Sequence, residues 1–139
     1  MKGGKLTAAQ MRRIETALAK VPYARLIGLE LDHVDSGVAK LFLEVREELK
    51  QNNGVVHGGA IASLIDTAAA FAVITKIPPR QRVTTVDLTI SYLQPLMSGK
   101  ATATARVIRA GRRLLVVSAE VVDQAGNAVA TALSTYITL

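Results

Sequence analysis

The chain has 139 residues, of which 50% are hydrophobic, so it fits one domain with a buried core and is not intrinsically disordered. Cysteine is absent, which excludes disulfides, thiolate metal sites and a cysteine nucleophile, and fits a reducing compartment. The formal net charge of +6 favours anionic partners.

The first predicted element is a helix over Thr7–Val21. Thr7 and Gln10 have the spacing of a capping box, and an apolar stripe follows at helical spacing until Pro22 ends the helix. The N-terminal sequence contains no long apolar core, so no signal peptide is expected and we predict a cytoplasmic location.

Six segments are predicted to form strands, most of them because apolar and polar residues alternate with a period of two. They are 29–34, 39–45, 86–92, 101–107, 115–121 and 129–137. In the third segment the apolar row starts at Val86, and the alternation places Thr85 on the opposite face. Turns are predicted around Gly111 and over Asp123–Asn127, where glycine, aspartate and asparagine favour tight loops.

A glycine-rich stretch precedes the most apolar segment of the chain. Gln51-x-x-Gly54-x-x-His57-Gly58-Gly59 leads into a run whose only charged side chain is Asp66. This run predicts a buried helix over about residues 58–75, too short and too polar at its centre to span a membrane. A carboxylate kept inside such a helix costs free energy, which marks it as a candidate functional group.

The order of these elements predicts an α+β fold in which an antiparallel sheet wraps around the long central helix. Residues 1–22 are expected to form a helical segment, and residues 23–139 the rest of the same single domain. One sheet covers only one side of a helix that is apolar nearly all round. The uncovered side therefore predicts a homodimer.

Several arginines cluster near the predicted turn at Gly111. Arg109, Arg112 and Arg113 are candidates for binding the phosphates of a small molecule, although a solvated hairpin tip explains them equally well. No aromatic residues interleave with them, so stacking on nucleic-acid bases is not expected.

The motif that ends in His57-Gly58-Gly59, with a carboxylate nine residues after the histidine, resembles the hotdog-fold acyl-CoA thioesterases. The resemblance is strongest to the phenylacetic-acid-degradation and thioesterase-superfamily type, and runs from about Tyr23 to the C-terminus. It implies hydrolysis of an acyl- or aryl-CoA to the free acid and CoA, with no cofactor and no metal. It also implies a homodimer with active sites at the interface, assembled further into a homotetramer.

The resemblance also implies roles for individual residues. The backbone N–H of Gly58 would hold the thioester carbonyl, and Asp66 would act as general base or nucleophile on substrate bound by the other subunit. Gln51 would lie near the thioester and the attacking water, and Thr85 would help to position that water. His57 would support the glycine loop.

Some members of this family have a threonine four residues after the carboxylate, where this chain has Ala70, so any help from that hydroxyl is absent. Aspartate at position 66, where the 4-hydroxybenzoyl-CoA branch has glutamate, points to the phenylacetic-acid-degradation branch of the family but does not identify a substrate. Two alternatives stay open at this point. One is a non-catalytic acyl-CoA binding protein, and the other is a hotdog hydratase or dehydratase that uses His57 as its base.

Overall fold

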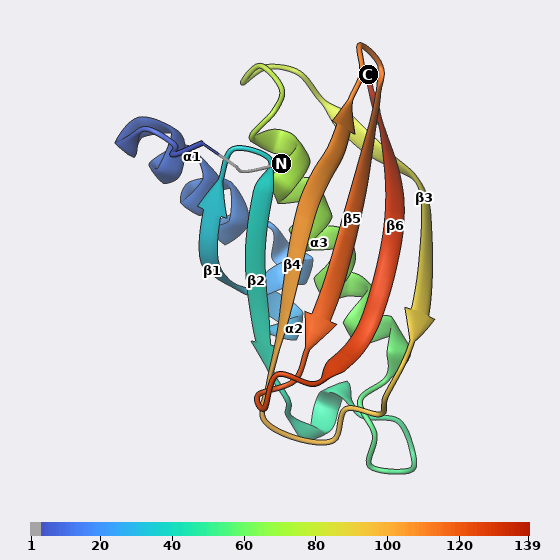
Figure 1. The fold of residues 1–139 in the computed structure, drawn as a ribbon. Helices are drawn as coiled ribbons and strands as arrows, with labels where there is room; N and C mark the ends of the chain where they lie inside the picture. Colours follow the sequence, from blue (N-terminus) through green and yellow to red (C-terminus); the bar gives the residue numbers. More distant parts are fainter. Residues whose placement is uncertain (1–3) are drawn as a thin grey trace.

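The structure, a computed structural model, describes residues 4–139, so the first three positions of the expected segment 1–22 lie outside it. A six-stranded antiparallel sheet curves around one long helix (Figure 1). The strands are β1 Glu30–Asp35, β2 Val38–Glu44, β3 Val83–Tyr92, β4 Lys100–Ala110, β5 Leu114–Val122 and β6 Ala128–Thr138. The helices are α1 Ala8–Ala19, α2 Pro22–Ile27, the single 3₁₀ turn η1 Glu47–Leu49 and α3 Gly58–Ile74. The predicted α+β architecture is confirmed.

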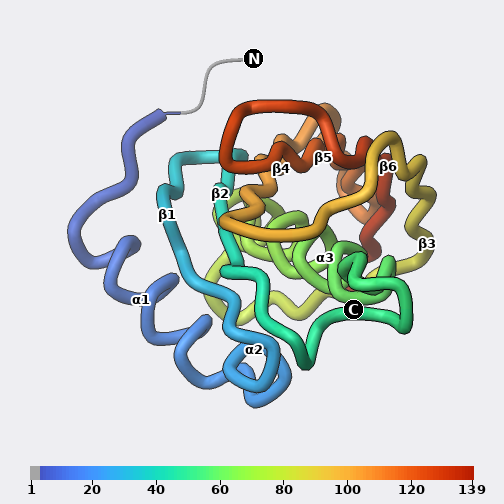
Figure 2. Tube along the Cα trace, turned by 90° about the horizontal axis from the view of Figure 1, so that it is seen from below, coloured from blue at the N-terminus to red at the C-terminus, as the bar shows by residue number. Residues whose placement is uncertain are grey.

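The sheet order is β1-β2-β4-β5-β6-β3, so β1 and β3 are its two edges. Seen along the sheet, α1 and α2 lie beside β1, whereas nothing among residues 4–139 covers the free edge of β3 (Figure 2). The sheet therefore has one edge flanked by helices and one long edge whose backbone groups are open on one side.

The N-terminal region differs from its prediction. The capping box of Thr7 and Gln10 is present, but α1 ends at Ala19. Pro22 does not end this helix. It begins a second one, α2, because the first helical position needs no N–H and proline has its φ angle already set.

The central helix and most strand faces agree with the sequence. The side chains of β2, β4 and β5 that face the helix are buried, and they pack on apolar side chains of α3. These buried residues include Leu41, Leu43, Ala103, Ala105, Val117 and Val121 from the strands, with Leu64, Ile65, Ala68 and Ala72 from α3. None of the helices in the described range is long and apolar enough to cross a membrane.

Strand β3 contains a β-bulge that the sequence does not reveal. Thr85 pairs with Tyr136 of β6, but the next pair is Asp87 with Thr135, so Val86 has no partner. The extra residue turns Val86 outward, where it is 55% exposed, and places Thr85 on the helix-facing side together with Leu88. The predicted apolar row from Val86 is therefore wrong at its first residue.

Candidate active site

Asp66 lies halfway along α3 and is held from the sheet by two hydroxyl groups. The hydroxyl of Tyr136 donates to Oδ1 of Asp66 at 2.7 Å, and Oγ1 of Thr85 donates to the same oxygen at 3.0 Å. The donors come from the neighbouring strands β6 and β3, and their residues are paired with each other in the sheet. The bulge at Val86 makes this arrangement possible, because without it Thr85 would face away from the helix.

The second carboxylate oxygen of Asp66 stays open. Among residues 4–139 no hydrogen bond reaches Oδ2, and no side-chain polar atom buried in this part of the chain lacks a partner. Oδ2 is therefore accessible at the surface of the single chain. One oxygen is fixed by the fold, and the other is available to a ligand or a water molecule.

The start of α3 presents a free backbone donor at Gly58. His57 is the N-cap of the helix, and its Nδ1 accepts the N–H of Gly59 at 2.8 Å. The next N–H, that of Ala60, donates to the carbonyl oxygen of His57 at 2.9 Å. No acceptor within residues 4–139 reaches the N–H of Gly58, which points out of a helix terminus that carries partial positive charge.

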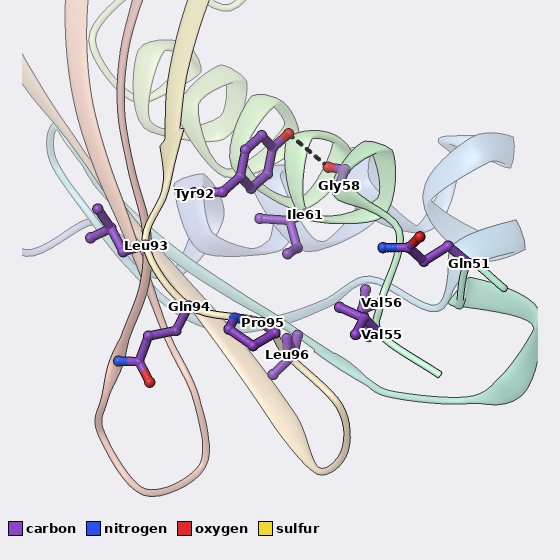
Figure 3. Close-up of a pocket in the computed structure, with 10 residues that line it drawn as sticks. All are labelled: Gln51, Val55, Val56, Gly58, Ile61, Tyr92, Leu93, Gln94, Pro95 and Leu96. Atoms are coloured by element: carbon purple, nitrogen blue, oxygen red, sulfur yellow. Dashed lines mark hydrogen bonds between the residues drawn. The ribbon is translucent and has the colours of Figure 1, made fainter. Parts of the chain in front are cut away.

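A cavity of about 320 Å³ opens beside this helix terminus (Figure 3). Tyr92 and Gln51 lie on either side of Gly58, and the hydroxyl of Tyr92 donates to the carbonyl oxygen of Gly58 at 2.9 Å. The side-chain amide of Gln51 has no hydrogen-bond partner among the described residues, so it is free to bind a ligand. The remaining lining residues are Val55, Val56, Ile61, Leu93, Gln94, Pro95 and Leu96.

The structure does not bring all the predicted site residues together within one chain. Gly58, Gln51 and the cavity lie at the start of α3, whereas Asp66 lies eight residues later and does not line the cavity. At a rise of 1.5 Å per residue, these two positions on the helix are about 12 Å apart along its axis. Thr85 groups with Asp66, and His57 groups with Gly58.

The arginines lie at the opposite end of the molecule from the cavity. Arg109, Arg112 and Arg113 are exposed on and beside the β4–β5 hairpin (Figure 1). The adjoining part of β4 is linked through Gly37 to Thr75, the C-cap of α3, because Val107 N–H donates to Gly37 and Gly37 N–H donates to Thr75. A helix of 17 residues is about 25 Å long, so these arginines do not reach the cavity of their own chain.

Sequence reasoning missed Tyr136 and gave no role to the hydroxyl of Tyr92. The available signal for Tyr136 was its place in an alternating row of β6, Ala130, Ala132, Ser134 and Tyr136, in which it is the only large side chain. Burial, next the hydrogen bond to Asp66 and then the negative charge of Asp66 raise the pKa of the Tyr136 phenol well above its usual 10.0. Tyr136 therefore remains a hydrogen-bond donor at every pH at which the fold is ordinarily studied.

Within the described part of the chain, no group of three or more His, Cys, Asp or Glu side chains is placed to hold a metal ion. The candidate site consists of a carboxylate, a free N–H at a helix terminus and neutral amide and hydroxyl groups. These groups suit the polarisation of a carbonyl and the delivery of water or a carboxylate to it.

The family follows from direct comparison. The model of the thioesterase superfamily matches residues 53–130, and the chain belongs to this family. The medium/long-chain acyl-CoA thioesterase YigI of Salmonella typhimurium is 30% identical over an alignment that covers 95% of this chain and 96% of that enzyme. The 1,4-dihydroxy-2-naphthoyl-CoA hydrolase of Listeria monocytogenes is 32% identical over 70% of this chain and 80% of that enzyme. The structure of the PaaI protein from the phenylacetic acid degradation operon of E. coli superposes with a TM-score of 0.87 at 25% identity, covering 93% of this chain and 92% of that one. The fold is therefore the hotdog fold, and the protein is a thioester hydrolase.

Proposed function

We propose that this protein hydrolyses acyl-CoA thioesters at sites formed between two copies of the chain. In each site, the N–H of Gly58 holds the thioester carbonyl oxygen, and the partner subunit's Asp66 supplies the carboxylate. The observation that carries this proposal is the separation of about 12 Å between Gly58 and Asp66 along one helix. Both groups are suited to the same reaction, yet they cannot reach the same carbonyl from a single chain.

Strand β3 is the edge that supports pairing with a second copy. It is ten residues long, contains no proline and has Asp87 as its only charged side chain. The other edge, β1, is six residues long, is bulged between Leu31 and His33 and carries four ionisable residues. Short, bulged and charged strands resist pairing, whereas a long and neutral edge strand favours it.

A two-fold axis beside β3 pairs the strand with its own copy in antiparallel orientation. This places the hairpin end of one subunit beside the cavity end of the other. Arg109, Arg112 and Arg113 then approach a ligand bound at the Gly58 of the other subunit. Guanidinium groups bind phosphates well, so these arginines are candidates for the phosphates of CoA.

The chemistry needs one polarised carbonyl and one activated nucleophile. The partial charge at the start of α3 favours the oxyanion that forms on the carbonyl oxygen of the substrate, and the Gly58 N–H donates to it. The Asp66 carboxylate either takes a proton from water, whose oxygen attacks the carbonyl carbon, or attacks that carbon itself to give a mixed anhydride that water then hydrolyses. On both routes the carbon–sulfur bond breaks and CoA leaves as its thiolate, which is then protonated.

Gln51 and His57 have supporting roles in this scheme. The free amide of Gln51 lines the cavity and orients the carbonyl or water without competing for a proton. His57 holds the glycine loop through Nδ1, which leaves that nitrogen unable to act as a base while the cap is intact. This contact speaks against a hydratase mechanism based on His57.

Thiol release from a panel of acyl-CoAs, spanning aryl, short, medium and long acyl groups, tests the activity beside Asp66→Asn. We expect hydrolysis of at least one class, and a loss of roughly 100-fold or more in the variant. Binding of acyl-CoA without hydrolysis would show that the protein is a non-catalytic acyl-CoA binding protein and not a thioesterase. Equal rates in both proteins would remove Asp66 from the mechanism.

Mixed dimers test whether the site is shared. Asp66→Asn chains and Gly58→Pro chains are each expected to be inactive, and the two are unfolded together and refolded. A mixed dimer contains one site with an intact Gly58 and an intact Asp66 only if the two residues act across the interface. Recovery of activity to a substantial fraction of wild type supports the shared site, and no recovery refutes it.

A further inference from the structure

We propose that Tyr136 is a positioning residue for the reaction: its phenol fixes the carboxylate of Asp66 so that Oδ2 faces the substrate. This inference rests on the proposed function. Tyr136 does not touch the substrate in this scheme. It acts only through Asp66.

The geometry places the phenol beneath the carboxylate. Tyr136 is 1% exposed, and its hydroxyl lies 2.7 Å from Oδ1 and 2.9 Å from the backbone oxygen of Asp66. Strand β6, which carries it, is paired on both sides, with β5 and with β3. A donor on an interior strand has little freedom to move, so the carboxylate of Asp66 accepts a hydrogen bond from a rigidly held group.

Two donors on one oxygen restrict the rotation of the carboxylate. Thr85 also binds Oδ1, at 3.0 Å, so both contacts from the sheet converge on the same atom. Rotation of the carboxylate about its Cβ–Cγ bond would break both contacts at once. Oδ2 is thereby kept on the open side of α3, where the proposed partner site lies.

The free oxygen, Oδ2, is the atom that takes a proton from water or attacks the thioester in the proposed scheme. A tyrosine needed only for packing would not require an acceptor at the end of its ring, and phenylalanine would fill the same volume.

Tyr136→Phe removes the hydroxyl and keeps the ring. We expect kcat to fall about 10- to 100-fold while KM stays within about 3-fold of wild type, because the substrate contacts are unchanged. A purely structural role would lower the melting temperature and leave the kcat of the folded enzyme near wild type.

Ser134→Ala is the matched control. Ser134 lies two residues before Tyr136 on the same strand, is also buried, and donates to the backbone oxygen of Asp87 rather than to Asp66. Its loss should leave kcat and KM near wild type. A comparable effect in Ser134→Ala would show that any lost buried hydroxyl on β6 disturbs the site, and would overturn the inference.

The outcomes separate this inference from the proposed function. If the activity of wild type depends on Asp66 and Tyr136→Phe retains the wild-type kcat, the positioning role is refuted and the thioesterase stands. If wild type hydrolyses no acyl-CoA, the proposed function and the inference fail together.

Discussion

The hydroxyl of Tyr92 lies 2.9 Å from the carbonyl oxygen of Gly58, and its ring closes over the first residue of α3. A Cβ built on Gly58 would lie 3.2 Å from Cζ of this ring, closer than most carbon atoms approach. Tyr92 therefore fixes the helix terminus from the side of the cavity, and at position 58 it leaves space for a glycine but little for a side chain. The N–H of Gly58 is both free and held in place.

Two substitutions at Gly58 separate its N–H from its small size. Gly58→Pro removes the donor at a helix position where proline is favoured, and His57 before it already has the extended backbone, φ −62° and ψ 134°, that proline requires. Gly58→Ala adds a Cβ and keeps the donor. We expect kcat/KM to fall roughly 100- to 1,000-fold in the proline variant, which is the usual effect of losing an oxyanion donor. The alanine variant should lose clearly less, since only the fit against Tyr92 changes. Equal losses in steady-state assays would mean that the N–H is not used.

Substitution of His57 tests whether its role is to cap α3. Asparagine is a good N-cap but cannot act as a base, whereas alanine can neither cap the helix nor act as a base. We expect His57→Asn to keep most of the activity and stability, and His57→Ala to lose about 1 kcal/mol of the free energy of unfolding in urea titrations. If both variants are equally inactive while both remain folded, His57 takes part in chemistry.

The sequence alone predicted the parts of this fold that depend on local pattern. The run after Gly59 is apolar and at helical spacing, so α3 was predictable to within one residue of its C-terminal end. The alternation in β2, β4 and β5 identified their buried faces, because the sheet pairs these strands without a bulge over most of their length. The glycine loop was found through its motif and by its resemblance to a family.

The environment of Asp66 was not predictable in the same way. The donor from β6, Tyr136, is seventy residues away along the chain, and only the pairing of β3 with β6 brings it near. The bulge at Val86 reverses the face on which Thr85 lies, and a period-two pattern does not contain such a register shift. The separation of Gly58 and Asp66 along α3 follows from the length of the helix, and only the resemblance to a family had implied that Asp66 acts on substrate bound by the other subunit.

Substitutions of Thr85 test the role of the second hydroxyl that donates to Asp66. Thr85→Val keeps the β-branched shape and removes the hydroxyl, whereas Thr85→Ser keeps the hydroxyl and removes a methyl group. We expect the valine variant to lose about tenfold in kcat, since an uncharged donor to a carboxylate is worth on the order of 1.5 kcal/mol. The serine variant should stay near wild type in the same assay. A serine variant as slow as the valine variant would assign the effect to packing of the bulge instead.

Alkaline pH should destabilise the protein through Tyr136. Its pKa is raised in the folded state above the usual 10.0, so below pH 10 the phenol is protonated in both states and its contribution to stability is complete. Above pH 10 the unfolded chain releases this proton and the folded chain does not, so the free energy of unfolding falls by up to about 1.4 kcal/mol per pH unit. Urea unfolding from pH 8 to 11 should show a steeper decline for wild type than for Tyr136→Phe, which lacks the group. Parallel curves would contradict the raised pKa.

The arginines of the β4–β5 hairpin should contribute to binding of the CoA phosphates from across the dimer. We expect Arg112→Ala combined with Arg113→Ala to raise KM for acyl-CoA about 10-fold, with little change in kcat, because phosphate contacts remote from the thioester bind substrate and transition state alike. For the corresponding acyl-pantetheine, which lacks the phosphates, KM should be the same in variant and wild type. Arg12→Ala combined with Arg13→Ala removes the same charge from α1 and should leave both KM values unchanged. A rise in KM for both substrates in the hairpin variant would indicate a disturbed dimer, and no rise for either would show that the hairpin is only a solvated turn.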